Sequence, residues 1–228
     1  MRIWIGFDFR EKEAYAVAAK TATAFGCDVI PIYEQRLRDA GLLTRPLDRR
    51  GLMYDLNSSA NQSTDFAISR FFVPILQHSG WALFADCDVV FLRDPHELLR
   101  IANPKKAVMV VKHVDLPIGE PTKMDGQVQT AYSRKNWSSV MLVNADHPAN
   151  RRLNLLSLNQ LPGRDLHAFS WLHDSEIGEL PAEWNWLVGI QSKPANPAIA
   201  HFTLGVPCLP NWEPKEHDSI WHLAREKK

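Results

Sequence analysis

The first 33 residues carry the pattern that most narrows the folds open to this chain. Residues 2–8 (RIWIGFD) are an apolar run of the kind that forms a short strand. Residues 11–25 are rich in Ala and contain no Gly or Pro, which predicts a helix. Residues 27–33 (CDVIPIY) predict a second strand, and Pro31 places it near a sheet edge or a strand end. This order of strand, helix and strand predicts parallel pairing through a right-handed crossover, and therefore an α/β fold.

The rest of the chain continues to alternate between strands and helices. Residues 35–62 are polar and irregular, which predicts a long loop with a little helix. Residues 63–76 begin with Ser-Thr-Asp and then become apolar at helical spacing, so they predict a helix that Pro74 kinks or interrupts. The other expected elements are strands over 81–92, 106–113, 137–144 and 198–207, and helices over 94–102 and 149–161.

The composition excludes several classes of protein. The chain has 228 residues and a formal net charge of zero, which argues against nucleic acid as the main partner. Three scattered cysteines favour a reducing compartment over a disulfide framework. The N-terminus becomes charged after nine residues, unlike a signal peptide, and no apolar run approaches the length of a transmembrane segment. We therefore expect a cytoplasmic protein.

Two carboxylates interrupt the apolar run WALFADCDVVFL at residues 81–92. On a strand, Asp86 and Asp88 would point to the same face, and Cys87 would point the other way. The ends of strands are where open α/β sheets bind their ligands. Two carboxylates this close repel each other unless a cation lies between them, and a divalent ion would also bind phosphate oxygens. The pair predicts a metal site that receives a phosphorylated substrate; the simpler alternative is a strand-end pair that caps a turn or binds Arg93.

His201 is a candidate third ligand. It lies in the strand-like run AIAHFTLG, between small apolar residues. One imidazole with two carboxylates suits Mn²⁺ better than Ca²⁺, with Mg²⁺ as the alternative ion. The simpler interpretation is a hydrogen-bonded core histidine.

Six segments occur in an order that resembles a known family: residues 3–21, 63–74, 84–94 (FADCDVVFLRD), 138–144 (SSVMLVN), 173–186 (HDSEIGELPAEWNW) and 200–205 (AHFTLG). They resemble the retaining glycosyltransferases of the GT-A fold, the group that includes glycogenin and bacterial galactosyltransferases. The resemblance covers nearly the whole chain. It implies one GT-A domain over residues 1–228 with a mostly parallel central sheet. Residues 1–110 would form the nucleotide-binding half, and residues 111–228 the acceptor side.

The resemblance also implies a set of site residues and ligands. It implies a nucleotide-sugar donor, usually a UDP-hexose, and Mn²⁺ held by Asp86, Asp88 and His201. Asp174 would contact the donor sugar, and it is the one candidate catalytic carboxylate in the sequence. Arg70 would meet the phosphates or the sugar; a cation in its apolar stretch needs an anionic partner, and Asp65 or Glu97 could serve instead. The loop after the first strand would place Phe7, Asp8 and Arg10 near the nucleobase. The remaining expected contacts with the donor are Cys87, Ser139 and Gly205.

The sequence departs from the family pattern at three places. Trp137, Ser138 and Ser139 stand where Asn-Ala-Gly or Asn-Ser-Gly is common. Ser175 follows Asp174, where the family often has Gln. Residues 201–212 (HFTLGVPCLPNW) have no lysine to neutralise the diphosphate, a role that Lys215 or Lys112 could take.

The expected reaction is metal-dependent transfer of a hexose to an acceptor hydroxyl, with contacts to the unknown acceptor from residues 115–137 and the tryptophans near 184–186. Asp8 could instead cap the helix that follows it.

Two other functions remain open. DCDVV also fits the nucleophile motif of haloacid-dehalogenase-like phosphatases. A catalytically impaired protein that binds a nucleotide sugar would explain the missing lysine.

Overall fold

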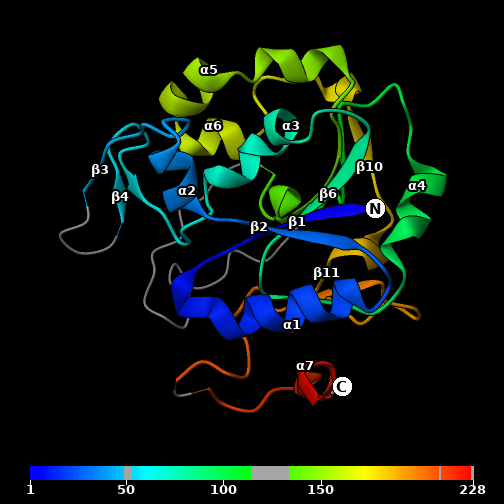
Figure 1. Ribbon diagram of the computed structural model, residues 1–228. Helices are drawn as coiled ribbons and strands as arrows, with labels where there is room; N and C mark the ends of the chain where they lie inside the picture. Colours follow the sequence, from blue (N-terminus) through cyan, green and yellow to red (C-terminus); the bar gives the residue numbers. More distant parts are fainter. Residues whose placement is uncertain (49–52, 114–133, 211, 227–228) are drawn as a thin grey trace.

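A six-stranded sheet forms the centre of the computed structural model, which describes residues 1–48, 53–113, 134–210 and 212–226 (Figure 1). The strand order is β10-β8-β9-β6-β1-β2. All the strands run in one direction except β9, which is antiparallel to both of its neighbours. The predicted α/β fold with a mostly parallel sheet is therefore confirmed. The strands are β1 (Arg2–Gly6), β2 (Asp28–Ile32), β6 (Trp81–Ala85), β8 (Val108–Val110), β9 (Val140–Asn144) and β10 (Ile177–Glu179).

The N-terminal strand–helix–strand unit forms as its sequence predicts. Helix α1 (Lys12–Thr23) connects β1 to β2, which pair in parallel with Trp4 opposite Ile30. Pro31 lies on β2, the edge strand of the sheet, where the missing N–H of proline costs no ladder hydrogen bond. Figure 1 shows α1 on one side of β1 and β2, with α3, α5 and α6 on the other.

The helices after α1 are short. Residues 63–76 give less helix than predicted, because a 3₁₀ turn over Ser69–Phe72 precedes α3 and Pro74 lies in the first turn of α3. Residues 35–62, predicted as a loop with a little helix, contain most of α2 and a small antiparallel sheet of β3 (Leu47–Asp48), β4 (Tyr54–Asp55) and β5 (Ala60–Asn61). The helices are α2 (Glu34–Asp39), α3 (Val73–Leu76), α4 (Leu98–Ile101), α5 (Leu155–Gln160), α6 (Gly163–His167) and α7 (Asp218–Glu226).

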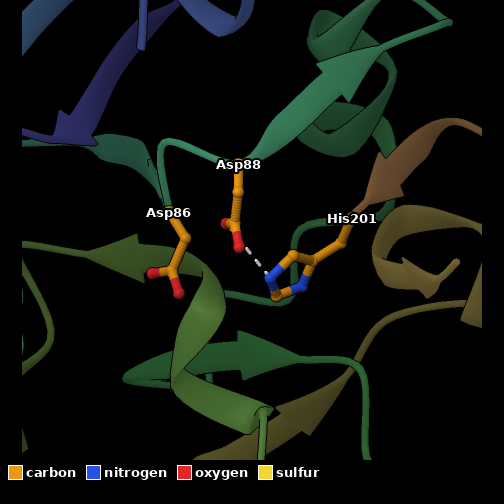
Figure 2. Close-up of side chains that lie close together, drawn as sticks. All are labelled: Asp86, Asp88 and His201. Atoms are coloured by element: carbon orange, nitrogen blue, oxygen red, sulfur yellow. Dashed lines mark ion pairs between the residues drawn. The ribbon is translucent and has the colours of Figure 1, made fainter. Parts of the chain in front are cut away.

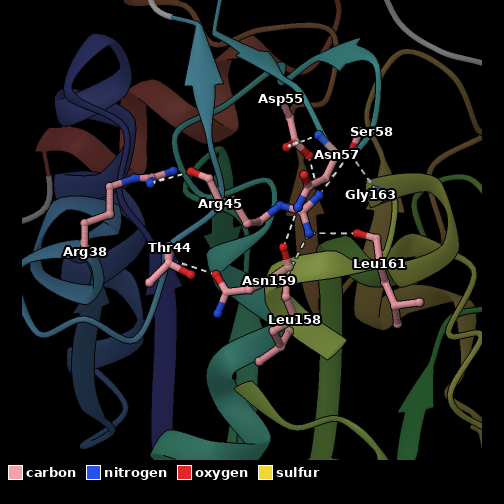
Figure 3. Close-up of polar contacts among 10 residues, drawn as sticks. All are labelled: Arg38, Thr44, Arg45, Asp55, Asn57, Ser58, Leu158, Asn159, Leu161 and Gly163. Atoms are coloured by element: carbon pink, nitrogen blue, oxygen red, sulfur yellow. Dashed lines mark hydrogen bonds and ion pairs between the residues drawn. The ribbon is translucent and has the colours of Figure 1, made fainter. Parts of the chain in front are cut away.

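A buried ion pair fastens this small sheet to the main body of the protein (Figure 3). Nη2 of Arg45 contacts Oδ2 of Asp55, and both side chains are fully buried. Nη1 of Arg45 donates to the carbonyl oxygens of Leu158 and Leu161, at 2.8 and 2.7 Å. Ser58 donates to Asp55 and accepts from the backbone N–H of Gly163 at 2.7 Å. Arg45, Asp55 and Ser58 are thereby fixed to α5 and to the start of α6.

A second, three-stranded sheet has the order β11 (Trp186–Leu187), β12 (Ile199–His201) and β7 (Val89–Phe91). β12 and β7 are antiparallel, with His201 opposite Val89. A small apolar core beneath them includes Trp186 and Trp221, and α7 packs there against α1. This sheet brings the C-terminal part of the chain against the residues that follow β6.

The main core lies on both faces of the large sheet. Ile3, Ile5, Leu83 and Phe84 are fully buried in it. β9 inserts between β8 and β6, so strands from residues 1–110 and 111–228 share one sheet. Within the described residues, every helix falls short of the length and apolar character that crossing a bilayer requires.

Candidate metal and donor site

Asp86, Asp88 and His201 converge at the carboxyl end of β6 (Figure 2). Each offers a ligand atom, and the three atoms lie within 4.8 Å of one another. Nε2 of His201 is 3.2 Å from Oδ1 of Asp88, and both of these side chains are almost fully buried. The structure thus brings together the three residues that the sequence analysis selected as metal ligands. Their role as ligands stays a prediction.

The carboxylates come together in a different way from the one expected. The predicted strand over 81–92 is wrong, because residues 86–88 separate β6 from β7. The backbone N–H of Asp86 donates to the carbonyl oxygen of Ser139, and the carbonyl oxygen of Asp88 accepts from Phe202. These bonds to two different sheets turn the chain at residues 86–88. The pairing of β7 with β12 then sets His201 beside Asp88, which alternation along one strand could not do.

Arg70 is the cationic partner of Asp86. Nη1 of Arg70 lies 2.8 Å from Oδ1 of Asp86 and donates to the carbonyl oxygen of Ser138 at 3.1 Å. The guanidinium group also lies over the rings of Phe66 and Phe84. Pairing of Arg70 with Asp65 or Glu97, which the sequence left open, is not observed among the described contacts. The other sequence-based alternative, a pair between Asp86 and Arg93, is likewise absent there, since Arg93 binds Glu97.

A cavity of about 410 Å³ opens beside Asp86 and Arg70. Ser138 and Ser139 line it, two of the three residues at which the sequence departs from Asn-Ala-Gly or Asn-Ser-Gly. His167 also lines it, and Nδ1 of His167 is 2.7 Å from Oγ of Ser138. Burial and then the charge of Arg70 lower the pKa of His167 well below its usual value, so this imidazole is neutral. The volume lies in the range of small-molecule sites in proteins.

Residues after β1 were expected near the nucleobase. The carboxylate of Asp8 is fully buried and accepts from the backbone N–H of Arg10, its guanidinium group and the backbone N–H of Asp65. Burial would raise the pKa of Asp8, but these hydrogen bonds outweigh it and lower the pKa. Asp8 thus caps the 3₁₀ turn Phe9–Glu11, as the alternative reading of this residue proposed. Phe7 packs between the rings of Tyr15 and Tyr33. Contacts of Phe7, Asp8 and Arg10 with a base remain predictions.

Cys87 lies between the two aspartates but faces away from the cavity. Its side chain is fully buried and the thiol donates to Glu11 at 3.1 Å. Burial, and then the negative charges of Glu11 and Asp88, raise the pKa of Cys87 well above its usual value, so it is a thiol at neutral pH. A contact of Cys87 with a donor is therefore open only to its backbone.

Gly205 has a φ of +115°, a conformation that other residues rarely adopt. A Cβ atom there would lie 2.9 Å from Leu209 and 3.1 Å from Trp212. This backbone conformation and close packing explain the glycine at position 205 without a ligand. Its predicted contact with the donor is not tested.

Asp174 is not among the residues that line the cavity. Its side chain is 88% exposed and pairs with Nη2 of Arg134 at 2.5 Å. The predicted catalytic role of Asp174 would need a substrate that reaches this exposed carboxylate, and it stays a prediction.

The two candidate replacements for the missing lysine, Lys112 and Lys215, have their ammonium groups over the rings of Trp137 and Trp212. The expected acceptor-binding segment 115–137 falls almost entirely outside the described residues.

Asn185 is a residue of the site that the sequence analysis missed. Its Oδ1 lies 2.9 Å from Nδ1 of His201, and the residue is fully buried. The signal was present, because Asn185 ends the run Leu-Pro-x-x-Trp-Asn in residues 173–186, one of the six segments that carry the family resemblance. Spacing alone could not show that this amide meets the imidazole of His201.

One curated relative shows where the chain belongs, although no family model matches it. Protein CDI from Arabidopsis thaliana is 40% identical over 229 residues, which cover 96% of this chain and 84% of the relative. The chain belongs to the same family as protein CDI. The name CDI describes no chemistry, so this kinship leaves the activity open.

The chain, a relative of protein CDI, has the GT-A fold of glycosyltransferases, as predicted. The apo form of the glycosyltransferase GlyE from Streptococcus pneumoniae matches 100% of the chain with a TM-score of 0.59 and 12% identity. The galactosyltransferase LgtC, solved with donor and acceptor sugar analogues, matches 99% with a TM-score of 0.55 and 14% identity. The chain spans 60% of GlyE and 95% of LgtC. Identities this low establish the shared fold alone.

Proposed function

We propose that the protein is a metal-dependent glycosyltransferase that moves a hexose from a UDP-sugar to an acceptor hydroxyl, with retention of configuration. One observation carries the proposal: Asp86, Asp88 and His201 present three ligand atoms within 4.8 Å, and Asp86 also lines the cavity. The GT-A fold and the ordered family motifs support it.

The three side chains fit a divalent cation. Two carboxylate oxygens and one imidazole nitrogen are ligands that Mn²⁺ accepts, and Mg²⁺ is the alternative. Asp88 directly precedes β7 and His201 ends β12, and both are buried, so little side-chain freedom would be lost on binding. A bound cation would act as a Lewis acid on the diphosphate leaving group.

The lining of the cavity supports a sugar as its ligand. One wall is the segment 58–64, in which every residue except Ala60 carries a hydroxyl or carboxamide group. These groups can donate hydrogen bonds to the hydroxyls of a hexose and accept hydrogen bonds from them, whereas a lipid chain would need an apolar lining. The buried Arg45–Asp55 pair fixes the start of this wall through Ser58.

Arg70 and Asp86 have defined roles in the proposed reaction. Arg70 lies 2.8 Å from Asp86, a proposed ligand of the cation that would bind the diphosphate. The positive charge of Arg70 would therefore be close enough to stabilise negative charge on the departing diphosphate. Retention requires attack from the face that the diphosphate leaves, or a double displacement through a carboxylate. Asp174 is proposed to contact the donor sugar, with residues 1–110 binding the nucleotide and residues 111–228 the acceptor.

Catalytically impaired binding is the second candidate, because the chain lacks the family lysine after His201. The phosphatase alternative fits the structure less well. In those enzymes the aspartate motif normally ends the first strand of its domain, whereas Asp86 and Asp88 follow β6, the third strand of the large sheet along the chain.

A ligand screen followed by a turnover assay tests the proposal. We expect a UDP-sugar to raise the melting temperature in the presence of Mn²⁺ and to do so weakly with EDTA. We further expect slow Mn²⁺-dependent release of UDP, faster with the right acceptor. Binding without any release of UDP would favour the impaired-binding alternative, and release of phosphate from an aryl phosphate would favour the phosphatase.

Asp88→Asn supplies the critical variant and Asp94→Asn its control. Asp88→Asn removes one proposed ligand and is expected to abolish the Mn²⁺-dependent signal. Asp94 caps the turn that precedes α4 and lies outside the site, so its variant should retain that signal. Full activity of Asp88→Asn in EDTA would rule out a metal held by this residue.

A further inference from the structure

The side chain of Asn185 links His201 to three other polar groups. Its Oδ1 faces Nδ1 of His201 at 2.9 Å. Its Nδ2 lies 3.0 Å from Oγ of Ser139, 3.0 Å from Nε2 of His113 and 3.1 Å from the carbonyl oxygen of Asn136. Asn185 thus meets His201 at Nδ1, whereas Nε2 is the ring nitrogen that faces Asp88.

The surroundings of Asn185 decide which end of its amide faces His201. The carbonyl oxygen of Asn136 can only accept a hydrogen bond, so the atom 3.1 Å from it must be the amide nitrogen. The hydroxyl of Ser139 donates to this same carbonyl at 2.7 Å, which leaves the oxygen of Ser139 to accept from Asn185. Rotating the amide by half a turn would place Oδ1 against the oxygen of Asn136. The oxygen of Asn185 therefore faces His201.

An oxygen facing Nδ1 requires a proton on that nitrogen. We propose that Asn185 holds a proton on Nδ1 of His201, so that Nε2 is the nitrogen presented to a cation shared with Asp88. This inference makes Asn185 a positioning residue and rests on the metal site of the proposed function. Nε2 already faces Asp88 at 3.2 Å, as Figure 2 shows.

Because of Asp88, the nitrogen of His201 that carries the proton decides whether Nε2 can bind a cation. In a neutral imidazole the single proton can lie on either nitrogen, and the carboxylate of Asp88 would attract it to Nε2. A proton on Nε2 blocks the lone pair that a cation needs. Asn185 opposes this by accepting a hydrogen bond from Nδ1–H, which is how outer hydrogen-bond partners orient metal-binding histidines and raise their affinity by about 10–100-fold.

His113 also contacts the amide nitrogen of Asn185, but it does not decide the orientation of the amide. Nε2 of His113 lies 3.0 Å from Nδ2 of Asn185, and Nδ1 of His113 lies 3.3 Å from Nε2 of Gln191. A neutral imidazole has one lone pair for accepting a hydrogen bond, so His113 accepts from only one of these two amides. The orientation of Asn185 therefore depends on Asn136 and Ser139, neither of which is a proposed metal ligand.

The position of the proton can be read directly. In protein labelled with ¹⁵N-histidine, long-range ¹H–¹⁵N correlation spectra distinguish a protonated Nδ1 from a protonated Nε2. Without metal, wild-type His201 should show a protonated Nδ1. Asn185→Leu should lose this signature, with the proton moving to Nε2, and its Mn²⁺ dissociation constant by calorimetry should rise about 10–100-fold.

Two further variants separate tautomer control from damage to the fold. Asn150→Leu removes a buried asparagine that bonds to Ala107 and Asn144, so it should cost stability while leaving both the His201 spectrum and Mn²⁺ affinity at wild-type values. Asn185→Asp keeps an acceptor for Nδ1–H, and it should retain the protonated Nδ1 and most of the affinity.

The outcomes distinguish this inference from the proposed function. A protonated Nδ1 in Asn185→Leu, or unchanged Mn²⁺ affinity in that variant, would overturn the role of Asn185. Failure of the wild-type protein to bind Mn²⁺ would disprove the metal site and the proposed function. The tautomer of metal-free His201 would still test whether Asn185 holds the proton on Nδ1.

Discussion

Nη1 of Arg70 and Oδ1 of Asp86 are 2.8 Å apart at the edge of the cavity, with side-chain exposures of 6% and 14%. The carboxylate that is proposed to bind a cation therefore already has its charge compensated by a guanidinium group. This relationship explains how Asp86 and Asp88 can lie close together in a folded protein before any metal arrives.

Replacing Arg70 should make the stability of the protein depend on metal. Arg70→Met leaves the charge of Asp86 uncompensated by the guanidinium, so we expect a loss of about 3–5 kcal/mol in the free energy of unfolding. Mn²⁺ should then raise the melting temperature of this variant more than that of the wild type. Arg93→Met is the control, since Arg93 pairs with the more exposed Glu97. An equal Mn²⁺ shift in Arg70→Met and wild type would contradict the prediction.

The Arg45–Asp55 pair should contribute strongly to stability as a pair. Arg45→Met is expected to cost about 3–5 kcal/mol in urea denaturation, because it leaves the buried carboxylate of Asp55 without its counter-charge. The double variant Arg45→Met/Asp55→Leu should recover much of this loss. Arg152→Met, which breaks an exposed pair with Glu176, should change stability little. A double variant no more stable than Arg45→Met would count against this account.

Stability should fall as the solution becomes mildly acidic. The pKa of His113 is lowered to about 4, chiefly by burial, against about 6.5 in an unfolded chain. Between pH 6.5 and 4, the imidazole of His113 binds a proton in the unfolded state but not in the folded state. The free energy of unfolding therefore drops as the pH falls. The full effect of such a shift is about 3 kcal/mol. Urea denaturation at pH 7 and 4.5 measures it, and His113→Gln should show a shallower decline.

Gly6 should resist even a methyl group. A Cβ at this position would lie 2.3–2.8 Å from the ring atoms of Phe66. Gly6→Ala should therefore cost about 1–3 kcal/mol through overpacking. In a Phe66→Leu background the same change should cost less, because the ring is gone, and a double-mutant cycle from thermal denaturation measures this coupling. Strictly additive effects would show that the close approach does not limit stability.

Much of the site could be read from the sequence, because its residues lie in short apolar contexts that are unusual for charged groups. Asp86 and Asp88 follow an apolar run, and His201 lies among small apolar residues, so both observations pointed to one site. The error at residues 81–92 was local. A run of apolar residues cannot reveal that hydrogen bonds to Ser139 and Phe202 break it into two strands.

Contacts between distant residues could not be read in the same way. Nothing in the sequence around Asn185 names His201, and nothing around Arg45 names Asp55, because each pair forms only when separate segments pack together. The side chain of Asp174 gives the opposite case. Family motifs selected it, yet the folded chain leaves it 88% exposed beside Arg134.

The sequence by itself determined the alternation of strands and helices, since side-chain periodicity and the placement of Gly and Pro act within a few residues. It also determined which residue types were available to bind a cation. The tertiary structure alone decided where the chain turns at Cys87, which nitrogen of His201 faces Asp88, and which cation compensates Asp86. These depend on long-range packing and on hydrogen-bond partners that lie many residues apart.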